Sequence, residues 1–349
     1  MTLLARTFVW LVVFGAMCVV AGSSAQWWET NVRSEQAEEL ETRNYFSVAT
    51  PISHTVPVPT RQRETVTFRE LPTGPLKVDI HTPSGVEVPS QGWPVIVSFH
   101  SGAWRGGHRA QVPIVELVEY GFAVVSPDFR SSDQAVFPAQ LDDCTDLIDW
   151  LVANGKSHHL NVKSIGLFGA SSGGHLALLT GLCDGRNPSI KAVCSLYPPS
   201  NFLTLEDGAG ASDEMNHFAP WAPESLLLGG QIPERPEAAQ LASPYWHAGR
   251  TENAPPILLM HGVDDLQVPF EQTLSLTRLL RQRQQPVTLW KVRSLEHGSW
   301  PNTRITSGVL SFFRRHLEGT TAPAERPQVA SHLRNSFERR PQYPLPLPR

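Results

Sequence analysis

Cysteine is scarce in this sequence, which contains four cysteines among 349 residues. Cys18 lies in an apolar N-terminal run, so Cys144, Cys183 and Cys194 remain for the rest of the chain. Three thiols can form at most one disulfide, which excludes a fold held together by a disulfide framework. Cys183 and Cys194 are the favoured pair if a bridge forms, but small, buried, reduced cysteines are the expected state.

The sequence also lacks a strong excess of either charge. It carries 29 Lys and Arg against 33 Asp and Glu, a formal net charge of −4. No basic stripe points to nucleic acid. The sequence contains no H-E-x-x-H, paired C-x-x-C or calcium-loop pattern, and no phosphate loop or dinucleotide fingerprint. We therefore expect no metal, no cofactor and no nucleic-acid partner.

The apolar run near the N-terminus is too short to span a bilayer as a helix, which needs roughly 20 residues. This run, Phe8–Gly22, has 15 residues and follows the basic residue Arg6. Ser23-Ser24-Ala25 then places small residues at the −3 and −1 positions of a cleavage site. The pattern predicts a signal peptide over residues 1–25, cleaved after Ala25, and a secreted or periplasmic protein with no integral membrane span after cleavage. An uncleaved anchor is the alternative.

Composition divides the rest of the chain into three parts. Residues 26–64 mix charges with Val56-Pro57-Val58-Pro59, which is typical of an extended N-terminal linker. Residues 65–317 fit a single catalytic domain. Within them, residues 200–255 are rich in Pro, Trp and acidic side chains and predict a partial lid insertion. Residues 318–349 contain Pro and Arg without apolar periodicity, so we expect a disordered tail.

Strand and helix patterns alternate through the central part. Short apolar runs predict strands over residues 65–71, 76–81, 94–100, 122–126, 164–168, 190–196, 257–260 and 287–292. Apolar residues at helical spacing predict helices near residues 137–154, through 177–181, and over 270–284 and 302–316. The first two strands form an antiparallel pair. The alternation predicts an α/β protein with a mostly parallel, eight-stranded sheet and helices on both faces.

A G-x-S-x-G motif, Gly169-Ala170-Ser171-Ser172-Gly173, follows the strand at 164–168 and precedes a helix. This strand–turn–helix context is the one that a nucleophile elbow requires. Ser171 would stand on a strained turn with its Oγ projecting, and larger side chains two positions away would collide there. Free N–H groups at the start of the helix favour developing negative charge. We predict that Ser171 is a nucleophile.

Small residues follow the strand that ends at His100. An oxyanion hole needs backbone N–H groups free to point at the substrate, and small residues after a strand allow this. We therefore assign the N–H groups of Gly102, Ala103 and Ser172 to an oxyanion hole. Trp104 comes next and is a candidate substrate-binding residue, with packing in the core as the alternative.

Two later loops supply candidate partners for Ser171. Asp264 and Asp265 follow the strand at 257–260, and we favour Asp265 over Asp264 as the residue that orients the base. His297 follows the last strand beside a glycine, and among 13 histidines it is the one at the right topological point for a general base. The chain order Ser–Asp–His is one of those in which catalytic triads occur.

With these motifs, the chain resembles the α/β-hydrolase esterases that include BD-FAE-type feruloyl and acetyl-xylan esterases. More distantly, it is similar to hormone-sensitive-lipase-like esterases and kynurenine formamidases. The resemblance spans residues 65–317 and rests on His100–Trp104, Asp128-Phe129-Arg130, Phe137-Pro138-Ala139 with Asp143, Gly169–Gly174 with His175, Ser243-Pro244, His261-Gly262 with Asp265 and Val268-Pro269, and His297-Gly298. It implies the α/β-hydrolase fold, a Ser171–Asp265–His297 triad, and scaffold roles for Arg130 and Asp143. The family pattern at the oxyanion loop is H-G-G-G-W, in which Ser101 and Ala103 here replace two glycines.

These expectations converge on a secreted serine carboxylesterase that works through an acyl-enzyme. Export and the resemblance together imply acetyl or feruloyl esters of a polysaccharide as substrates, so the partner would be a small-molecule or carbohydrate ester. An aryl-formamidase is the enzymatic alternative, and a catalytically silent binding protein of the same fold is the other. The oligomeric state is not defined by the sequence.

Overall fold

The computed structural model describes residues 60–183, 186–206, 216–292, 297–298 and 303–319. The predicted signal peptide and its cleavage site, most of the predicted linker and nearly all of the predicted tail lie outside the described residues. Among the described residues, no helix combines the length and apolar character needed to cross a membrane.

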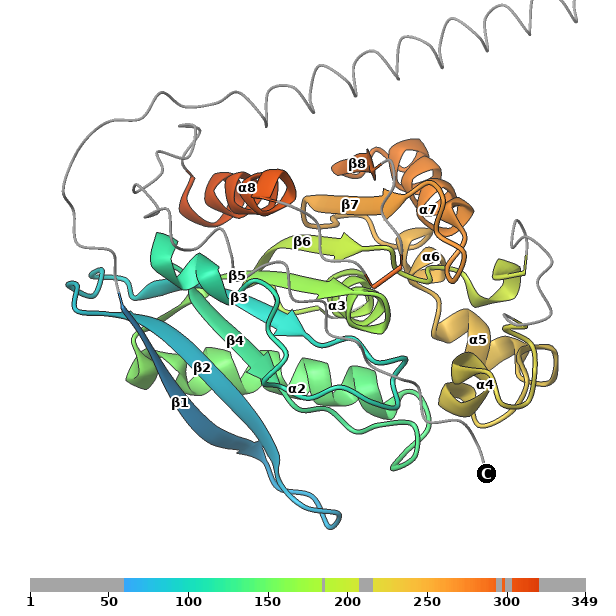
Figure 1. The fold of residues 1–349 in the computed structure, drawn as a ribbon, viewed down its shortest axis with the longest axis horizontal. Helices are drawn as coiled ribbons and strands as arrows, with labels where there is room; N and C mark the ends of the chain where they lie inside the picture. Colours follow the sequence, from blue (N-terminus) through green and yellow to red (C-terminus); the bar gives the residue numbers. More distant parts are fainter. Residues whose placement is uncertain (1–59, 184–185, 207–215, 293–296, 299–302, 320–349) are drawn as a thin grey trace, which may run out of the picture.

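Eight strands form a single mixed sheet in the order β1-β2-β4-β3-β5-β6-β7-β8 (Figure 1). The strands are β1 (Thr60–Arg69), β2 (Leu76–Ser84), β3 (Trp93–Phe99), β4 (Ala123–Pro127), β5 (Leu160–Ala170), β6 (Ile190–Leu196), β7 (Ile257–Gly262) and β8 (Val287–Val292). β2 runs antiparallel to both β1 and β4, and the other neighbours are parallel. The predicted mostly parallel, eight-stranded sheet is confirmed.

The first strand begins earlier than the sequence pattern predicts. We expected the linker to run to residue 64, but β1 begins at Thr60 and Thr60 already pairs with Ser84 of β2. Residues 60–65 are exposed, so they carry no buried apolar alternation that would identify them as a strand. Their backbone pairing with β2 holds them in the sheet.

Helices cover both faces of the sheet because alternate residues of a strand point to opposite sides. Val95 and Val97 of β3 pack in one buried cluster, with side chains from α2, α3 and α7. Ile96, which lies between them, packs in the second cluster, with side chains from η1 and α8. The helices of these two layers are α2 (Ala139–Asn154), α3 (Ser172–Leu182), α7 (Phe270–Gln282), the 3₁₀ helix η1 (Val115–Tyr120) and α8 (Thr303–Phe313). Two apolar cores therefore enclose the sheet.

Short helices occupy the segment between β6 and β7, where the sequence predicts a lid insertion. They are η3 (Phe202–Thr204), α4 (Pro223–Leu228), η4 (Ile232–Glu234), α5 (Pro236–Leu241) and α6 (Pro244–Ala248). Proline stands at the start of α4, α5 and α6, where its missing N–H costs nothing. Figure 1 shows α4 and α5 beyond the end of the sheet, away from β1.

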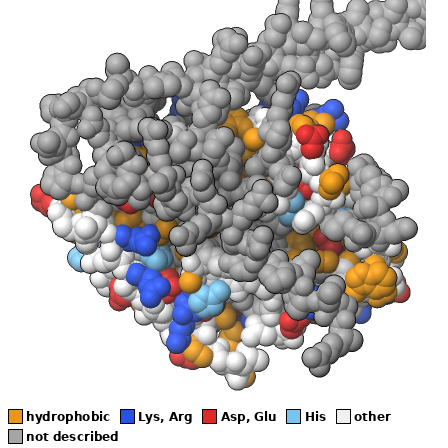
Figure 2. Space-filling model, viewed as in Figure 1, with side chains coloured by type: hydrophobic (Ala, Val, Ile, Leu, Met, Phe, Trp, Pro, Cys, Tyr) orange, Lys and Arg blue, Asp and Glu red, His pale blue; other side chains and the backbone are white. Residues whose placement is uncertain are grey.

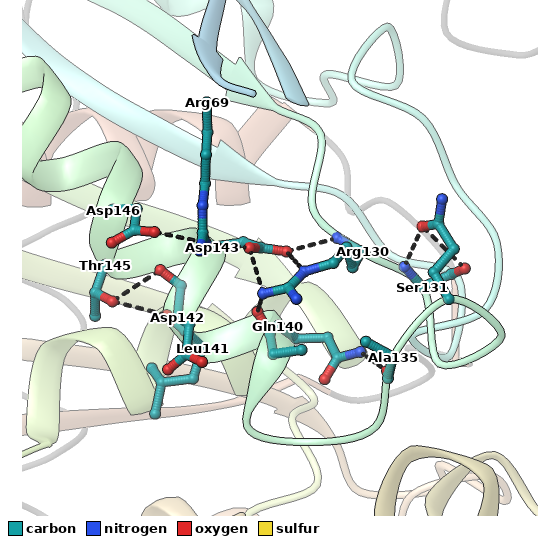
Figure 3. A network of polar contacts seen from close by, with 12 residues as sticks. Arg69, Arg130, Ser131, Ala135, Gln140, Leu141, Asp142, Asp143, Thr145 and Asp146 are labelled. Atoms are coloured by element: carbon teal, nitrogen blue, oxygen red, sulfur yellow. Dashed lines mark hydrogen bonds and ion pairs between the residues drawn. The ribbon is translucent and has the colours of Figure 1, made fainter. Parts of the chain in front are cut away.

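A buried polar network ties the edge of the sheet to α2 (Figure 3). The Asp143 side chain on α2 is fully buried and accepts from Arg69 Nη1 of β1 at 2.7 Å. Arg130, in the loop after β4, donates its Nε and Nη2 at 2.8 Å each and its backbone N at 2.9 Å to the same carboxylate. Four charge-assisted or backbone donors thus satisfy this carboxylate, which fits the scaffold role that the resemblance implies for Arg130 and Asp143.

The cysteines of the described residues form no disulfide. Cys144 and Cys194 are buried, Cys183 is half-buried, and Cys183 and Cys194 are not joined. Burial disfavours the thiolate and raises the pKa of both Cys144 and Cys194. These two residues therefore serve as small apolar side chains of the cores.

Candidate active site

The candidate residues gather where the connections of the sheet diverge. The chain leaves β3 for β4 on one side and then passes to β5 on the other side of β3. In open α/β sheets, ligands bind at the carboxyl ends of strands at such a point. The loop that carries Gly102 follows β3, and Ser171 follows β5, so both lie at this edge.

Ser171 occupies a strained turn between β5 and α3. Its φ of 52° and ψ of −125° are rare for a residue with a side chain. A Cβ atom on Gly169 would lie 2.2 Å from the carbonyl carbon of Gly173, and one on Gly173 would lie 2.3 Å from the carbonyl oxygen of Phe99. The turn therefore needs glycine at both positions, which is why the motif takes the form G-x-S-x-G.

The structure brings the three predicted triad residues together. Ser171 Oγ lies 2.9 Å from His297 Nε2, and His297 Nδ1 lies 2.9 Å from Asp265 Oδ2. The serine and the histidine are 126 residues apart in the chain. Asp264, the alternative acid, is exposed, and the histidine contacts its neighbour instead. This arrangement allows His297 to take a proton from Ser171 while the carboxylate holds the ring.

Backbone and side-chain donors surround the Asp265 carboxylate. Its Oδ1 accepts from the N–H groups of Gln267 at 2.8 Å and Val268 at 3.0 Å. Its Oδ2 lies 3.3 Å from His261 Nε2 as well as 2.9 Å from His297. Burial opposes ionisation, but the hydrogen bonds from His261 and His297 and the attraction of His297 outweigh it and hold the pKa of Asp265 below its usual range. Asp265 is therefore an ionised acceptor at neutral pH.

His261 is a supporting residue that sequence reasoning did not assign. It is fully buried, its Nδ1 lies 2.6 Å from Thr273 Oγ1, and its Nε2 lies 3.0 Å from the carbonyl oxygen of Val268. Since Nε2 faces a carbonyl and a carboxylate, it carries the ring proton, and Nδ1 accepts from the threonine hydroxyl. The sequence signal was the His261-Gly262 pair at the end of β7, four residues before Asp265.

The predicted oxyanion loop has the backbone geometry that free N–H groups require. Gly102 and Ala103 have positive φ angles of 130° and 55°. Among the described residues, the N–H groups of Gly102, Ala103 and Ser172 have no hydrogen-bond acceptor. Ser101 Oγ donates to the carbonyl of Ala170 at 2.9 Å, which fixes the loop against the strand that carries the nucleophile. The three N–H groups are thus available to a negatively charged oxygen.

Trp104 lines the cavity and also packs in the core. It is 2% exposed, and its Nε1 donates to His175 Nδ1 at 3.1 Å. His175 Nε2 in turn donates to the carbonyl of Ala242 at 2.7 Å. Burial lowers the pKa of His175 to about 3, so the ring is neutral and fixed in one tautomer. Sequence reasoning did not foresee this support beneath Trp104.

An open cavity adjoins the serine and the histidine. Besides Ser171 and His297, its lining includes His217, Trp221 and Glu224 from the segment between β6 and β7. Figure 2 shows hydrophobic side chains exposed over the α4 end of the molecule, and Trp221 is 72% exposed. The insertion predicted from composition therefore shapes the cavity. Among the described residues, no group of three or more His, Cys, Asp or Glu side chains is placed to hold a metal ion.

Comparisons with known proteins give a consistent result. The BD-FAE family model matches residues 78–280. Esterase LipC of Mycobacterium tuberculosis is 29% identical over 209 residues, which are 56% of this chain and 50% of LipC. A solved truncated carbohydrate esterase from gut microbiota is 24% identical with a TM-score of 0.63, over 76% of this chain and 99% of that one. A bifunctional GH43-CE protein of Bacteroides eggerthii is 25% identical with a TM-score of 0.63, over 73% of this chain and 38% of that one.

The predicted α/β-hydrolase fold is confirmed by these structural matches together with the strand order. The chain spans about half the length of the curated relatives that it matches.

Proposed function

The chain belongs to the BD-FAE family, and from that premise we propose that it is a serine esterase that hydrolyses carboxylic esters through an acyl-enzyme. The observation that carries this proposal is the continuous hydrogen-bonded path from Ser171 through His297 to Asp265, with both distances at 2.9 Å. Beside that path lie three free N–H groups and an open cavity. Nucleophile, base, orienting acid and oxyanion donors are the parts that acyl transfer needs.

In the first half of the cycle, His297 Nε2 takes the proton from Ser171 as Oγ attacks the ester carbonyl. The carbonyl oxygen becomes negative and rests on the N–H groups of Gly102, Ala103 and Ser172. His297 then gives its proton to the departing alcohol, and the acyl group stays on the serine. Asp265 stabilises the positive ring throughout.

In the second half, water enters where the alcohol left. His297 takes a proton from this water as its oxygen attacks the acyl carbonyl, and the same N–H groups hold the second oxyanion. The bond to Ser171 Oγ then breaks, His297 returns the proton to the serine, and the carboxylic acid leaves. Both halves use the same residues, so one site suffices for the full cycle.

We propose acetyl or feruloyl esters of a polysaccharide as the substrate class. Membership of the BD-FAE family supports this, as does the similarity to the bifunctional GH43-CE protein of Bacteroides eggerthii. An open cavity with an exposed tryptophan at its wall suits a bulky alcohol better than a closed pocket would. We further propose export, on the basis of the N-terminal pattern that ends at Ala25.

The test of the catalytic proposal is the Ser171→Ala variant with p-nitrophenyl acetate as substrate. Turnover should fall to the background of the solution reaction, since the nucleophile is lost, while the circular dichroism spectrum and the melting temperature stay those of the wild type. A fluorophosphonate probe should label the wild type at Ser171 and should not label the variant.

Two outcomes would contradict the proposal. If the wild type neither turned over the ester nor reacted with the probe, the catalytically silent alternative would hold. If formylkynurenine were cleaved much faster than acetylated xylan and feruloyl sugars in the same assay, the protein would be an aryl-formamidase. N-terminal sequencing of protein from the periplasm or the medium tests the cleavage after Ala25.

A further inference from the structure

We propose that Glu224, held by His217, binds a hydroxyl group on the alcohol part of the substrate and so selects hydroxyl-rich alcohols such as sugars. This inference rests on the proposed esterase function and deepens it. Both residues belong to the segment between β6 and β7 and line the same cavity as Ser171.

His217 is fixed between two acceptors. Its Nδ1 lies 3.2 Å from Glu224 Oε1, and its Nε2 lies 2.9 Å from the carbonyl oxygen of Gln267. A carbonyl can only accept, so Nε2 carries a hydrogen, and Nδ1 faces the carboxyl group of Glu224. Burial lowers the pKa of His217, but the hydrogen bond and charge of Glu224 outweigh it, and the pKa lies above its ordinary value.

The two carboxyl oxygens of Glu224 differ in their hydrogen bonding. Its Oε1 accepts from His217, whereas its Oε2 is buried and has no hydrogen-bond partner among the described residues. The whole residue is only 4% exposed. A buried carboxylate oxygen without a donor is costly, and such groups are almost always satisfied in proteins. Rotation of the Glu224 side chain toward the cavity would let a donor that enters beside α4 supply the missing bond.

The position of the pair relates it to the alcohol rather than to the acyl group. His297 Nε2 delivers the proton to the departing alcohol, so the alcohol must lie on the His297 side of Ser171. Gln267, which accepts from His217, belongs to the loop that also carries Asp265, the partner of His297. His217 and Glu224 thus adjoin the side of the cavity from which the alcohol departs.

Trp221 completes a site of mixed character. It lines the cavity three residues before Glu224 and is 72% exposed. A sugar ring offers apolar C–H faces and a rim of hydroxyl groups, and an exposed indole beside an unsatisfied carboxylate oxygen matches both. A plain aromatic or alkyl alcohol would use the indole and leave the oxygen without a donor.

The experiment compares two acetyl esters that differ in the alcohol. Monoacetylated xylotriose presents hydroxyl groups, and p-nitrophenyl acetate presents none. Glu224→Met removes the acceptor at similar length, and Glu224→Gln keeps an uncharged one. The ratio of kcat/KM for the sugar ester to that for the phenyl ester should fall by about tenfold to hundredfold in Glu224→Met, and by less in Glu224→Gln. Glu237→Met, an exposed glutamate on α5, is the matched control and should leave the ratio unchanged.

Direct binding separates this inference from the esterase proposal. In the Ser171→Ala background, the Kd of monoacetylated xylotriose, measured by calorimetry, should rise at least tenfold on adding Glu224→Met. Trp221→Ala, at an exposed position that cannot unsettle the core, should also raise it. An unchanged ratio and Kd in Glu224→Met would mean that a buried water satisfies the oxygen, and would overturn the inference. Loss of wild-type turnover of both esters would refute the esterase proposal, and the Kd measurement would still decide this one.

Discussion

Replacing Asp265 by asparagine should inactivate the protein, because it would move the ring proton of His297 from Nδ1 to Nε2. The amide has one acceptor and one donor end, and the two backbone N–H groups of Gln267 and Val268, at 2.8 and 3.0 Å from Oδ1, require the acceptor end. The NH₂ group must then face His297 Nδ1 and His261 Nε2. His297 responds by moving its own proton to Nε2, because Nδ1 must now accept.

With a proton on Nε2, the histidine can no longer take one from Ser171, from which it is separated by 2.9 Å. Loss of the correct tautomer in a serine triad lowers kcat by about 10⁴-fold. We therefore expect kcat of Asp265→Asn for p-nitrophenyl acetate at pH 7.5 to fall by about four orders of magnitude, while fluorophosphonate labelling slows in parallel.

Asp264→Asn is the matched control, because the neighbouring aspartate is exposed and should retain nearly full activity. Melting temperatures of both variants must be recorded, so that unfolding is not mistaken for a loss of chemistry. If Asp265→Asn kept more than a tenth of the wild-type kcat, or if Asp264→Asn were the inactive variant, the tautomer argument would be wrong.

Two further predictions concern stability. Asp143→Asn removes one of the two carboxylate oxygens that face Arg69 and Arg130, so the free energy of unfolding should fall by about 3–5 kcal/mol in urea titrations. The control Asp142→Asn, at an exposed neighbouring position, should change it by less than about 0.5 kcal/mol. Equal stabilities of the two variants would refute the role of the network. His175 has a pKa of about 3 in the folded protein against about 6.5 when unfolded, so below pH 6.5 the unfolded chain binds a proton that the folded one rejects. Between pH 7 and pH 5 this group alone should lower the free energy of unfolding by about 2 kcal/mol. In His175→Gln the loss of stability over the same pH range should be smaller by that amount, and an unchanged loss would contradict the burial argument.

The strands could be predicted best where apolar runs end at clear turns. Residues 190–196 and 287–292 have the predicted bounds. β5 begins at Leu160 rather than at the predicted residue 164, because Leu160 pairs with Trp93 of β3. The sequence pattern missed this start, since Asn161 and Lys163 interrupt the apolar run. Backbone pairing with a neighbour extends a strand through polar residues, and a single sequence does not contain that information.

The candidate site divides in the same way. Ser171, Asp265 and His297 could be found because each stands in a recognisable local motif a few residues after a strand ends. The contacts of His175 and His217 could not be predicted, because each has a partner that is distant in the chain: Ala242 is 67 residues from His175, and Gln267 is 50 residues from His217. Their roles arise only when the segment between β6 and β7 folds over the sheet edge.

The bond between Arg69 and Asp143 determines where a shortened form of this protein can begin. A gene trimmed to start at β2 would keep every residue of the proposed catalytic machinery. It would also remove Arg69, one of the two cations that neutralise Asp143 on α2. Without β1, β2 would become an exposed edge strand that could pair with another copy of the chain. A soluble truncated version for crystallisation therefore has to start upstream of Thr60.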